Sequence, residues 1–252
     1  MSMDRGQREG DEVLLMGNEA IARGALEAGV QVAAGYPGTP SSEIIETLSR
    51  FAETGKLYVE WSTNEKVAME TAAAASFAGL RSLCVMKQNG VNVASDFLLN
   101  LAGSGTRAGM ILITCDDPGA LSSVNEGESR HFARLMEIPL LEPADFQEAK
   151  EMTRWAFTLS EQIRNVVMVR SVTRMSHASG NVILGALPPA VRKAEFLCDG
   201  AVSDPERGPV ISAPVIEKHS LQQEKIRKAA AIFEKSPFNA YSGPERPELL
   251  II

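Results

Sequence analysis

One carboxylate lies at a position where it could do chemistry. The run VEWSTNEKVAMETAAAASFAG places Glu65 at the start of an alanine-rich helical pattern, directly after an apolar segment. Ser62 and Glu65 match the S-x-x-E capping box, in which both side chains bond to free amide groups of the first helical turn. The alternative is that Glu65 points out of its own chain and exchanges a proton with a bound ring. This stretch by itself favours the cap and leaves both roles open.

A second candidate is the segment GYPGTPSSE at 35–43. Its two prolines and two glycines predict a stiff, tightly specified turn that exposes Thr39. The next helix is expected to start at Ser41 or Ser42, since serine is a preferred residue at helix starts. Two prolines within so short a segment exceed what a simple connection needs, which favours a functional turn.

Two further polar segments follow apolar runs. The first is KQNGVN at 87–92, which is rich in amides, and the second is the long stretch 116–134, which is polar and contains glycine. A long polar loop favours a functional role, although a plain surface loop has the same composition. Ligands of open α/β sheets gather at the carboxyl ends of the strands, so we expect these segments to share one edge.

The elements that must position these residues alternate from residue 11 to about residue 183. Nearly continuous apolar strands that alternate with helices predict a mostly parallel sheet with helices on both faces, a doubly wound α/β domain at 11–183. Strands are expected at 12–16, 30–35, 57–61, 82–86, 109–115, 138–143 and 166–170, and helices at 18–29, 41–53, 63–79, 91–102, 125–136 and 145–163.

The two ends of the chain have a different character. Residues 1–10 are polar and charged and predict a disordered tail. Residues 184–252 carry most of the remaining prolines and predict an extended linker with one helix at about 220–235. The final PELLII resembles the first half of a buried strand, so we expect a further, missing domain after it.

Composition excludes several classes of protein. A net charge of −7 argues against a nucleic-acid or anionic-membrane binder, and no apolar run approaches the ~20 residues of a membrane span. Cys84, Cys115 and Cys198 lie far apart and form no metal-binding spacing, so no metal site is expected in this chain. Phosphate-loop and dinucleotide motifs are also missing. These features are typical of a cytoplasmic protein. His177 follows a strand, where a structural hydrogen bond is the favoured role.

Several segments together resemble a known family. MGNEAIARGALEAG, GYPGTPSSEI, VEWSTNEKVAMETAAAASFAGLRS, MKQNGVNVASD, DDPG…SSVNE and TRMSH occur in the order and spacing of the thiamine-diphosphate-dependent 2-oxoacid:ferredoxin oxidoreductases. The chain is similar in particular to the amino-terminal, pyrimidine-binding region of indolepyruvate ferredoxin oxidoreductase alpha subunits. The resemblance covers nearly the whole chain.

The resemblance implies a cofactor role for the carboxylate described above. Glu65 would hydrogen-bond N1′ of the thiamine diphosphate aminopyrimidine and favour the 4′-imino tautomer, whose nitrogen removes the thiazolium C2 proton. This resemblance favours the catalytic role of Glu65 over the cap. It also implies that Pro37, Gln88 and Asn92 line the pyrimidine site.

The same resemblance implies a substrate site. Thr39 matches a family threonine near the substrate carboxylate, and Arg134 matches an arginine that pairs with it. Arg130 is a rival of Arg134, and the spacing does not decide between them. The implied reaction is the oxidative decarboxylation of an aryl-pyruvate-type 2-oxoacid, such as indolepyruvate, with coenzyme A to an acyl-CoA and with ferredoxin as electron acceptor.

Two parts of the family pattern are absent from this chain. It lacks the G-D-G…N motif that holds magnesium and the diphosphate, and it lacks the cysteine clusters of the iron–sulfur centres. We therefore expect Mg2+ and the clusters on missing domains or on a partner subunit. The chain is expected to form a homo- or hetero-oligomer through the helices at 63–79 and 91–102. We expect no activity of the chain alone. The alternatives are a subunit of a non-oxidative thiamine-dependent 2-oxoacid decarboxylase, or a non-catalytic fragment or scaffold.

Overall fold

The computed structural model of the protein describes residues 8–52, 57–189, 193–196, 214–246 and 248. The strands are β1 (Glu12–Met16), β2 (Val32–Gly35), β3 (Tyr58–Trp61), β4 (Ser82–Lys87), β5 (Met110–Asp116), β6 (Leu140–Leu141), β7 (Val167–Val172) and β8 (Ser179–Ile183). The helices are α1 (Gly17–Glu27), α2 (Ser42–Ala52), α3 (Glu65–Phe77), α4 (Gln88–Ser104), α5 (Ser129–Met136), α6 (Phe146–Ile163), α7 (Thr173–His177) and α8 (Val215–Phe233).

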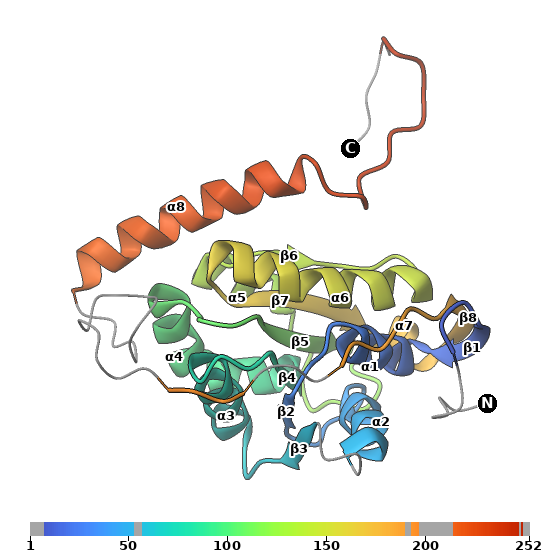
Figure 1. Ribbon diagram of the computed structural model, residues 1–252, viewed down its shortest axis with the longest axis horizontal. Coiled ribbons are helices and arrows are strands. Elements are labelled where there is room, and N and C mark those ends of the chain that lie inside the picture. The colour runs from blue at the N-terminus through green and yellow to red at the C-terminus, as the bar shows by residue number, and fades with distance from the viewer. Residues whose placement is uncertain (1–7, 53–56, 190–192, 197–213, 247, 249–252) are drawn as a thin grey trace.

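A parallel sheet of six strands forms the centre of the molecule, in the order β3-β2-β4-β5-β7-β6. Alternate residues of its apolar strands enter two separate cores. Leu83 and Val85 of β4 join the core formed with α1, α2 and α6. Cys84 and Met86 join the core formed with α3, α4 and α5. Helices thus cover both faces of the sheet (Figure 1), which confirms the predicted doubly wound α/β fold.

The first strand does not join this sheet. β1 pairs antiparallel with β8 in a separate two-stranded sheet, so the assignment of residues 12–16 to the parallel sheet is wrong. The reason is that β1 runs without a loop into α1, whose first residue packs directly on α7. A Cβ on Gly17 would lie 2.0 Å from the carbonyl oxygen of Met175, so the two segments approach as closely as glycine allows. Neither α7 nor β8 was predicted.

Several helix boundaries differ from those predicted. α4 begins at Gln88, directly after β4, so that most of KQNGVN is the first helical turn and not a loop. α5 begins only at Ser129, which leaves residues 117–128 irregular. α8 spans residues 215–233 and starts before the predicted residue 220.

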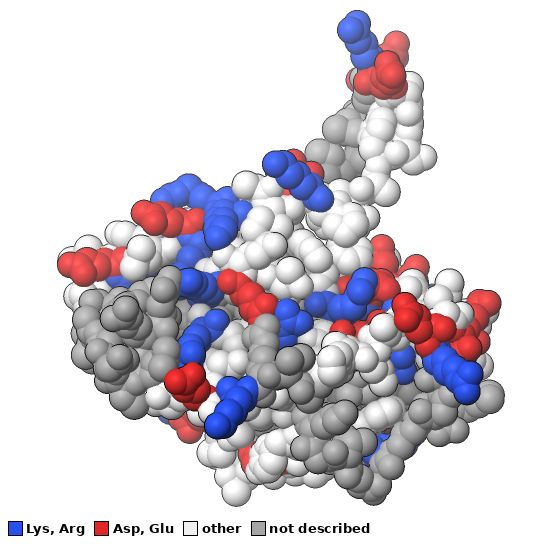
Figure 2. Space-filling model, viewed as in Figure 1, with Lys and Arg blue, Asp and Glu red and all other residues white. Residues whose placement is uncertain are grey.

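α8 lies at the amino edge of the sheet, where the strands begin. Its side chains reach the last carbonyl groups of two other helices. Gln222 Nε2 donates to the carbonyl of Met136 at the end of α5 (2.6 Å), and Lys225 Nζ donates to the carbonyl of Arg164 after α6 (3.0 Å). Basic side chains gather over α8 in the view of Figure 2. These hydrogen bonds satisfy carbonyl groups that the ends of α5 and α6 would otherwise leave free.

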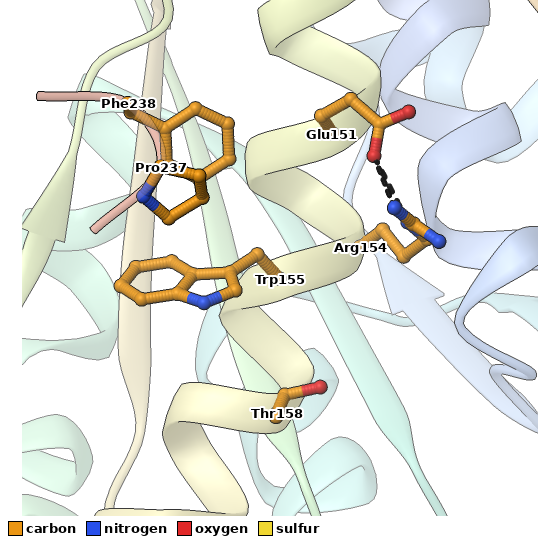
Figure 3. A pocket seen from close by; sticks show the side chains of 6 residues that line it. All are labelled: Glu151, Arg154, Trp155, Thr158, Pro237 and Phe238. Carbon is orange, nitrogen blue, oxygen red and sulfur yellow. Dashed lines mark hydrogen bonds and ion pairs between the residues drawn. The ribbon is translucent and has the colours of Figure 1, made fainter. Parts of the chain in front are cut away.

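The end of α8 and the segment after it pack on the outer face of α6. The ring centroid of Trp155 lies 5.8 Å from that of Phe233 and 5.6 Å from that of Phe238. Figure 3 shows Pro237 and Phe238 lying over Trp155, with the Glu151–Arg154 ion pair to one side. These residues and Thr158 line a cavity of about 390 Å3. These aromatic contacts tie the chain beyond α8 to the domain.

Other predictions concern residues that the structure does not describe. Most of the predicted tail at 1–10, much of the predicted linker and most of PELLII lie outside the described residues. The boundaries proposed for the linker and the further domain therefore remain predictions. Among the helices of the described residues, none combines the length and apolar character that a membrane span needs.

Candidate active site

Two neighbouring strands send their connections to opposite faces of the sheet. β2 leads to α2 on one face, and β4 leads to α4 on the other. Ligands of open α/β sheets bind in the crevice at the carboxyl ends of such strands. A Cβ on Gly38 would lie 2.8 Å from Cδ of Lys87, so the Lys87 side chain lies directly across the turn that follows β2. The predicted segments at 35–43 and 87–92 thus meet at this point.

The turn presents the predicted residues at the surface of this edge. Pro37 and Thr39 are both accessible, and the Thr39–Pro40 peptide bond is cis. The turn is held from below by Asn18, a fully buried residue of α1, whose Nδ2 donates to the carbonyl of Pro40 (2.7 Å). Asn18 therefore holds the backbone directly after Thr39, and the substrate role of Thr39 remains a prediction.

The capping box predicted at the start of α3 is wrong. The N-cap of α3 is Asn64, whose Oδ1 accepts a hydrogen bond from the backbone N–H of Val67 (2.9 Å). Ser62 Oγ instead donates to Glu60 Oε1 (2.6 Å). Asparagine caps a helix as well as serine does, and it lies two residues closer to the alanine-rich run. Glu65 is therefore the first residue of the helix and has no capping function.

The Glu65 side chain lies between α3 and α4. It is half-buried, and a Cβ on Gly90 of α4 would lie 2.5 Å from Glu65 Cγ. Cys84 of β4 is close enough that, besides burial, the negative charge of Glu65 raises the pKa of its thiol. Among the described residues, no hydrogen bond or ion pair reaches the Glu65 carboxylate. The carboxylate is thus free to bond to a molecule from outside the chain.

Gln88 and Asn92 are not brought together with Glu65. Gln88 Cγ would lie 3.2 Å from a Cβ on Gly127, so this side chain packs under the loop before α5. Successive residues of an α-helix are rotated by about 100°, so Gly90, two residues after Gln88, lies on the opposite side of α4 and faces α3. Gln88 is buried, yet neither its Oε1 nor its Nε2 has a partner among the described residues, whereas Asn92 is exposed. An unpaired buried amide costs roughly 1–3 kcal/mol, which favours a polar partner brought by a ligand or by water.

The two candidate arginines occupy different levels of α5. Arg130 is the second residue of the helix, at the carboxyl edge of the sheet, and Arg134 lies one turn further on. α5 runs toward the amino edge, so four residues at 1.5 Å per residue place the Arg134 backbone about 6 Å further from the crevice. Arg130 Nε donates to Glu142 Oε2 (2.9 Å), and its guanidinium also pairs with Glu128. These two carboxylates raise the pKa of Arg130.

A buried charge network lies beneath Arg130. Arg170, within β7, is 8% exposed, and its Nε donates to Oδ2 of the fully buried Asp116 (2.6 Å). The same Asp116 oxygen accepts the backbone N–H of Ser129, the first residue of α5 (3.0 Å). This network was not predicted. The available signals were the arginine that ends the otherwise apolar run VVMVR and the two adjacent aspartates at the end of β5.

The long loop at 117–128 is anchored at its base. Desolvation opposes ionisation of Asp117, but hydrogen bonds from Thr173 Oγ1 (2.7 Å) and from the backbone N–H of Ser122 (2.8 Å) outweigh it and lower the pKa of Asp117 to about 2. His177 of α7 lies at the same edge, with Nε2 3.4 Å from Glu43 Oε1. The predicted structural role of His177 remains a prediction.

The chain matches a protein-family model over residues 23–206. That family is described as pyruvate flavodoxin/ferredoxin oxidoreductase, thiamine diphosphate-binding. The chain belongs to this family. The match covers most of the residues described above, including both edges of the crevice, and it confirms the family predicted from the sequence motifs.

Several relatives have names of the same kind. The chain is 44% identical over 245 residues to the indolepyruvate oxidoreductase subunit IorA of Thermococcus kodakarensis, which covers 97% of this chain and 38% of that protein. It is 45% identical over 235 residues to the IorA subunit of Archaeoglobus fulgidus, with coverage of 92% and 37%. The 2-oxoglutarate synthase subunit KorA of Methanothermobacter thermautotrophicus is 27% identical over 208 residues, with coverage of 77% and 55%. The chain thus spans well under half the length of its IorA relatives.

A solved structure supports the fold. The 2-oxoglutarate:ferredoxin oxidoreductase from Magnetococcus marinus, with 2-oxoglutarate, coenzyme A and succinyl-CoA bound, superposes with a TM-score of 0.69. The match covers 93% of this chain and 47% of that chain at 18% sequence identity. At this identity the likeness establishes a shared fold.

Proposed function

We propose that this chain is the pyrimidine-binding part of a 2-oxoacid:ferredoxin oxidoreductase of the indolepyruvate type. One observation carries the proposal. The Glu65 carboxylate lies half-buried at the predicted edge of the sheet, against a glycine, and has no partner among the described residues. Its position at the first residue of α3, with a different residue as the cap, leaves the carboxylate available for a ligand.

The residues around Glu65 fit an aminopyrimidine. Gly90 lets the carboxylate lie directly against the backbone of α4, and the apolar core residues of β4 lie beneath it. Thiamine diphosphate, when bound, supplies the nucleophilic carbon and the electron sink for decarboxylation of a 2-oxoacid. The task of Glu65 is to hold and exchange one proton with the ring nitrogen N1′. Pro37 would contribute to the wall of the site. Gln88 and Asn92 would contact the cofactor from the side of α4 opposite Glu65.

The substrate carboxylate is assigned to Thr39 and Arg130. Both lie at the carboxyl edge of the sheet, and an arginine fork is well suited to bind a carboxylate through two hydrogen bonds. Arg134 is the less favourable choice, because its backbone lies one helical turn further from this edge.

The proposed reaction of the whole enzyme is the oxidative decarboxylation of an aryl-pyruvate, such as indolepyruvate, with coenzyme A to an acyl-CoA. Ferredoxin would accept the electrons. Other domains or subunits would supply the Mg2+-diphosphate site and the iron–sulfur clusters, in a cytoplasmic oligomer. Alanines of α3 and α4 such as Ala72 and Ala94 are buried in their own core, so contacts to a partner would involve exposed residues such as Val93 and Leu99.

Purification of the native complex tests the proposal. We expect it to contain thiamine diphosphate and iron, and to reduce ferredoxin when indolepyruvate and coenzyme A are added together. Aldehyde formation without reduction of ferredoxin would instead identify a non-oxidative decarboxylase. A complex that contains neither thiamine diphosphate nor iron would identify a scaffold.

A further inference from the structure

A single carboxylate at the surface connects Arg130 to the buried charges beneath it. Glu142 follows β6, and its Oε1 accepts from a terminal nitrogen of Arg170 (2.5 Å) and from one of Arg130 (2.8 Å). Desolvation opposes ionisation of Glu142, but the hydrogen bonds from Arg130 and Arg170 outweigh it and lower its pKa. Glu142 therefore remains charged between two guanidinium groups.

Arg170, the buried arginine of this network, cannot move freely. Arg170 is almost fully buried and pairs with the fully buried Asp116, which also accepts the first backbone N–H of α5. Any other rotamer of Arg170 would remove the positive charge that offsets the buried Asp116 carboxylate, which is strongly destabilising. Arg170 therefore provides a fixed reference point under the N-terminus of α5.

The guanidinium of Arg130 binds two carboxylates, one on each side. Its Nε and one terminal nitrogen bind Glu142 in a bidentate pair, at 2.9 Å and 2.8 Å. The other terminal nitrogen binds Glu128, which forms no hydrogen bond or ion pair with the buried network among the described residues. Both carboxylates are similarly accessible, with side chains 35% and 39% exposed. An exposed ion pair contributes little, so the Glu128 side of Arg130 is easily given up to another carboxylate.

We propose that Glu142 is a positioning residue that fixes Arg130 for the substrate carboxylate, and that Glu128 only occupies the place of that carboxylate until it arrives. The inference deepens the proposed function, since it depends on Arg130 as the substrate-binding cation. A half-exposed arginine has many rotamers, and fixing one of them on binding costs conformational entropy that weakens affinity. Glu142 fixes the Arg130 rotamer before the substrate binds, so this cost does not fall on binding.

Two matched variants test this in the assembled enzyme. Glu142→Gln breaks the bidentate pair, and Glu128→Gln removes the same charge from the other side of the same arginine. We expect Glu142→Gln to raise KM for the 2-oxoacid about tenfold, the effect of one charge-assisted hydrogen bond, with kcat within a few-fold. Glu128→Gln should leave KM unchanged or lower it. Equal shifts in both variants would mean that only local charge matters, and would overturn the inference.

A second measurement needs no activity. Amide hydrogen exchange of residues 129–134 in the purified chain reports the order of the first turns of α5. We expect faster exchange in Glu142→Gln than in Glu128→Gln, and equal rates would contradict the positioning role.

The variant Arg130→Met distinguishes the proposed substrate role of Arg130 from the positioning role of Glu142. An unchanged KM in that variant would remove Arg130 from the proposed substrate site, whereas a raised KM with equal Glu142→Gln and Glu128→Gln variants would refute only the positioning role.

Discussion

The two edges of the central sheet are built in opposite ways. At the amino edge, side chains of α8 reach the free carbonyl groups at the ends of α5 and α6. At the carboxyl edge, the amide of Gln88, Oδ1 of Asn18 and the carboxylate of Glu65 have no partner among the described residues. The amino edge thus has its helix ends bonded by side chains of α8, whereas the carboxyl edge keeps a whole amide and a carboxylate without a partner among the described residues.

This difference separates stability from function. A buried polar group without a partner costs free energy, so a fold keeps such groups where a ligand can satisfy them. The amino edge is not free of exceptions, since the hydroxyls of Ser82 and Thr106 also lack a partner among the described residues. A hydroxyl has fewer hydrogen-bonding positions to satisfy than a whole amide or a carboxylate. We therefore expect substitutions at the carboxyl edge to affect activity, and substitutions at the amino edge to affect stability.

The largest effect is expected from Glu65→Gln in the assembled enzyme. Glutamine keeps the size of the side chain but cannot share a proton with N1′, so turnover should fall by ~100-fold to 10,000-fold. The measurement is C2 proton exchange of bound thiamine diphosphate together with turnover. Asn64→Ala is the control, because it removes the actual helix cap and should lose about 1 kcal/mol of stability with activity retained. If Glu65→Gln keeps activity within a few-fold, the assignment of Glu65 is wrong.

A second comparison uses two glycines of the same helix. Gly90→Ala places a Cβ 2.5 Å from Glu65 Cγ and should displace the carboxylate, whereas Gly103→Ala meets only Gln222 Oε1 at 3.9 Å. A misplacement of about 1 Å at a reacting group costs about 100-fold in rate, so Gly90→Ala should reduce turnover by that order. Gly103→Ala should leave turnover unchanged, and both variants should be as stable as the parent or more so, because alanine favours helix. Equal turnover in the two variants would contradict the predicted role of the Gly90 contact.

Away from the carboxyl edge, Trp155→Ala should destabilise the chain. Two aromatic pairs are lost, to Phe233 and Phe238, and each contributes about 0.5–1.5 kcal/mol beyond its buried area. We expect the free energy of unfolding in chemical denaturation to fall by at least about 1–3 kcal/mol, the sum of the two pair terms, with activity of the assembled enzyme retained. Tyr241→Ala is the control, since this ring is 58% exposed and should change stability by less than about 0.5 kcal/mol. Similar losses in both variants would argue against the docking of the segment after α8.

The smallest effect concerns pH. Burial and then the positive charges of Arg164 and Lys218 lower the pKa of Lys225 to about 8, below the value of about 10.4 in an unfolded chain. Between these two values the unfolded chain binds more protons, so the free energy of unfolding should rise as pH increases from about 8 to about 10. Lys225→Met should reduce this slope, and Lys228→Met should leave it. An unchanged slope in Lys225→Met would show that another group is responsible.

Local sequence pattern determined a large part of this protein. The apolar runs of β4, β5 and β7 and the helices between them were predictable, because a buried strand or an amphipathic helix is recognisable from its own residues. The same holds for the turn around Thr39, whose prolines and glycines restrict the backbone locally. The family followed from motifs of this kind, and Glu65 was identified as a candidate from its place between a strand and a helix.

Only the tertiary structure decided the contacts between distant segments. The pairing of β1 with β8, the choice of Asn64 as the cap, and the link from Arg170 through Glu142 to Arg130 join residues that are far apart or that compete for one position. Short polar stretches such as STN fit several caps equally well, and an arginine at the end of a strand does not indicate its partner. Burial of Arg170 and Asp116 makes their pairing obligatory, and burial is a property of the packed fold and not of any single segment.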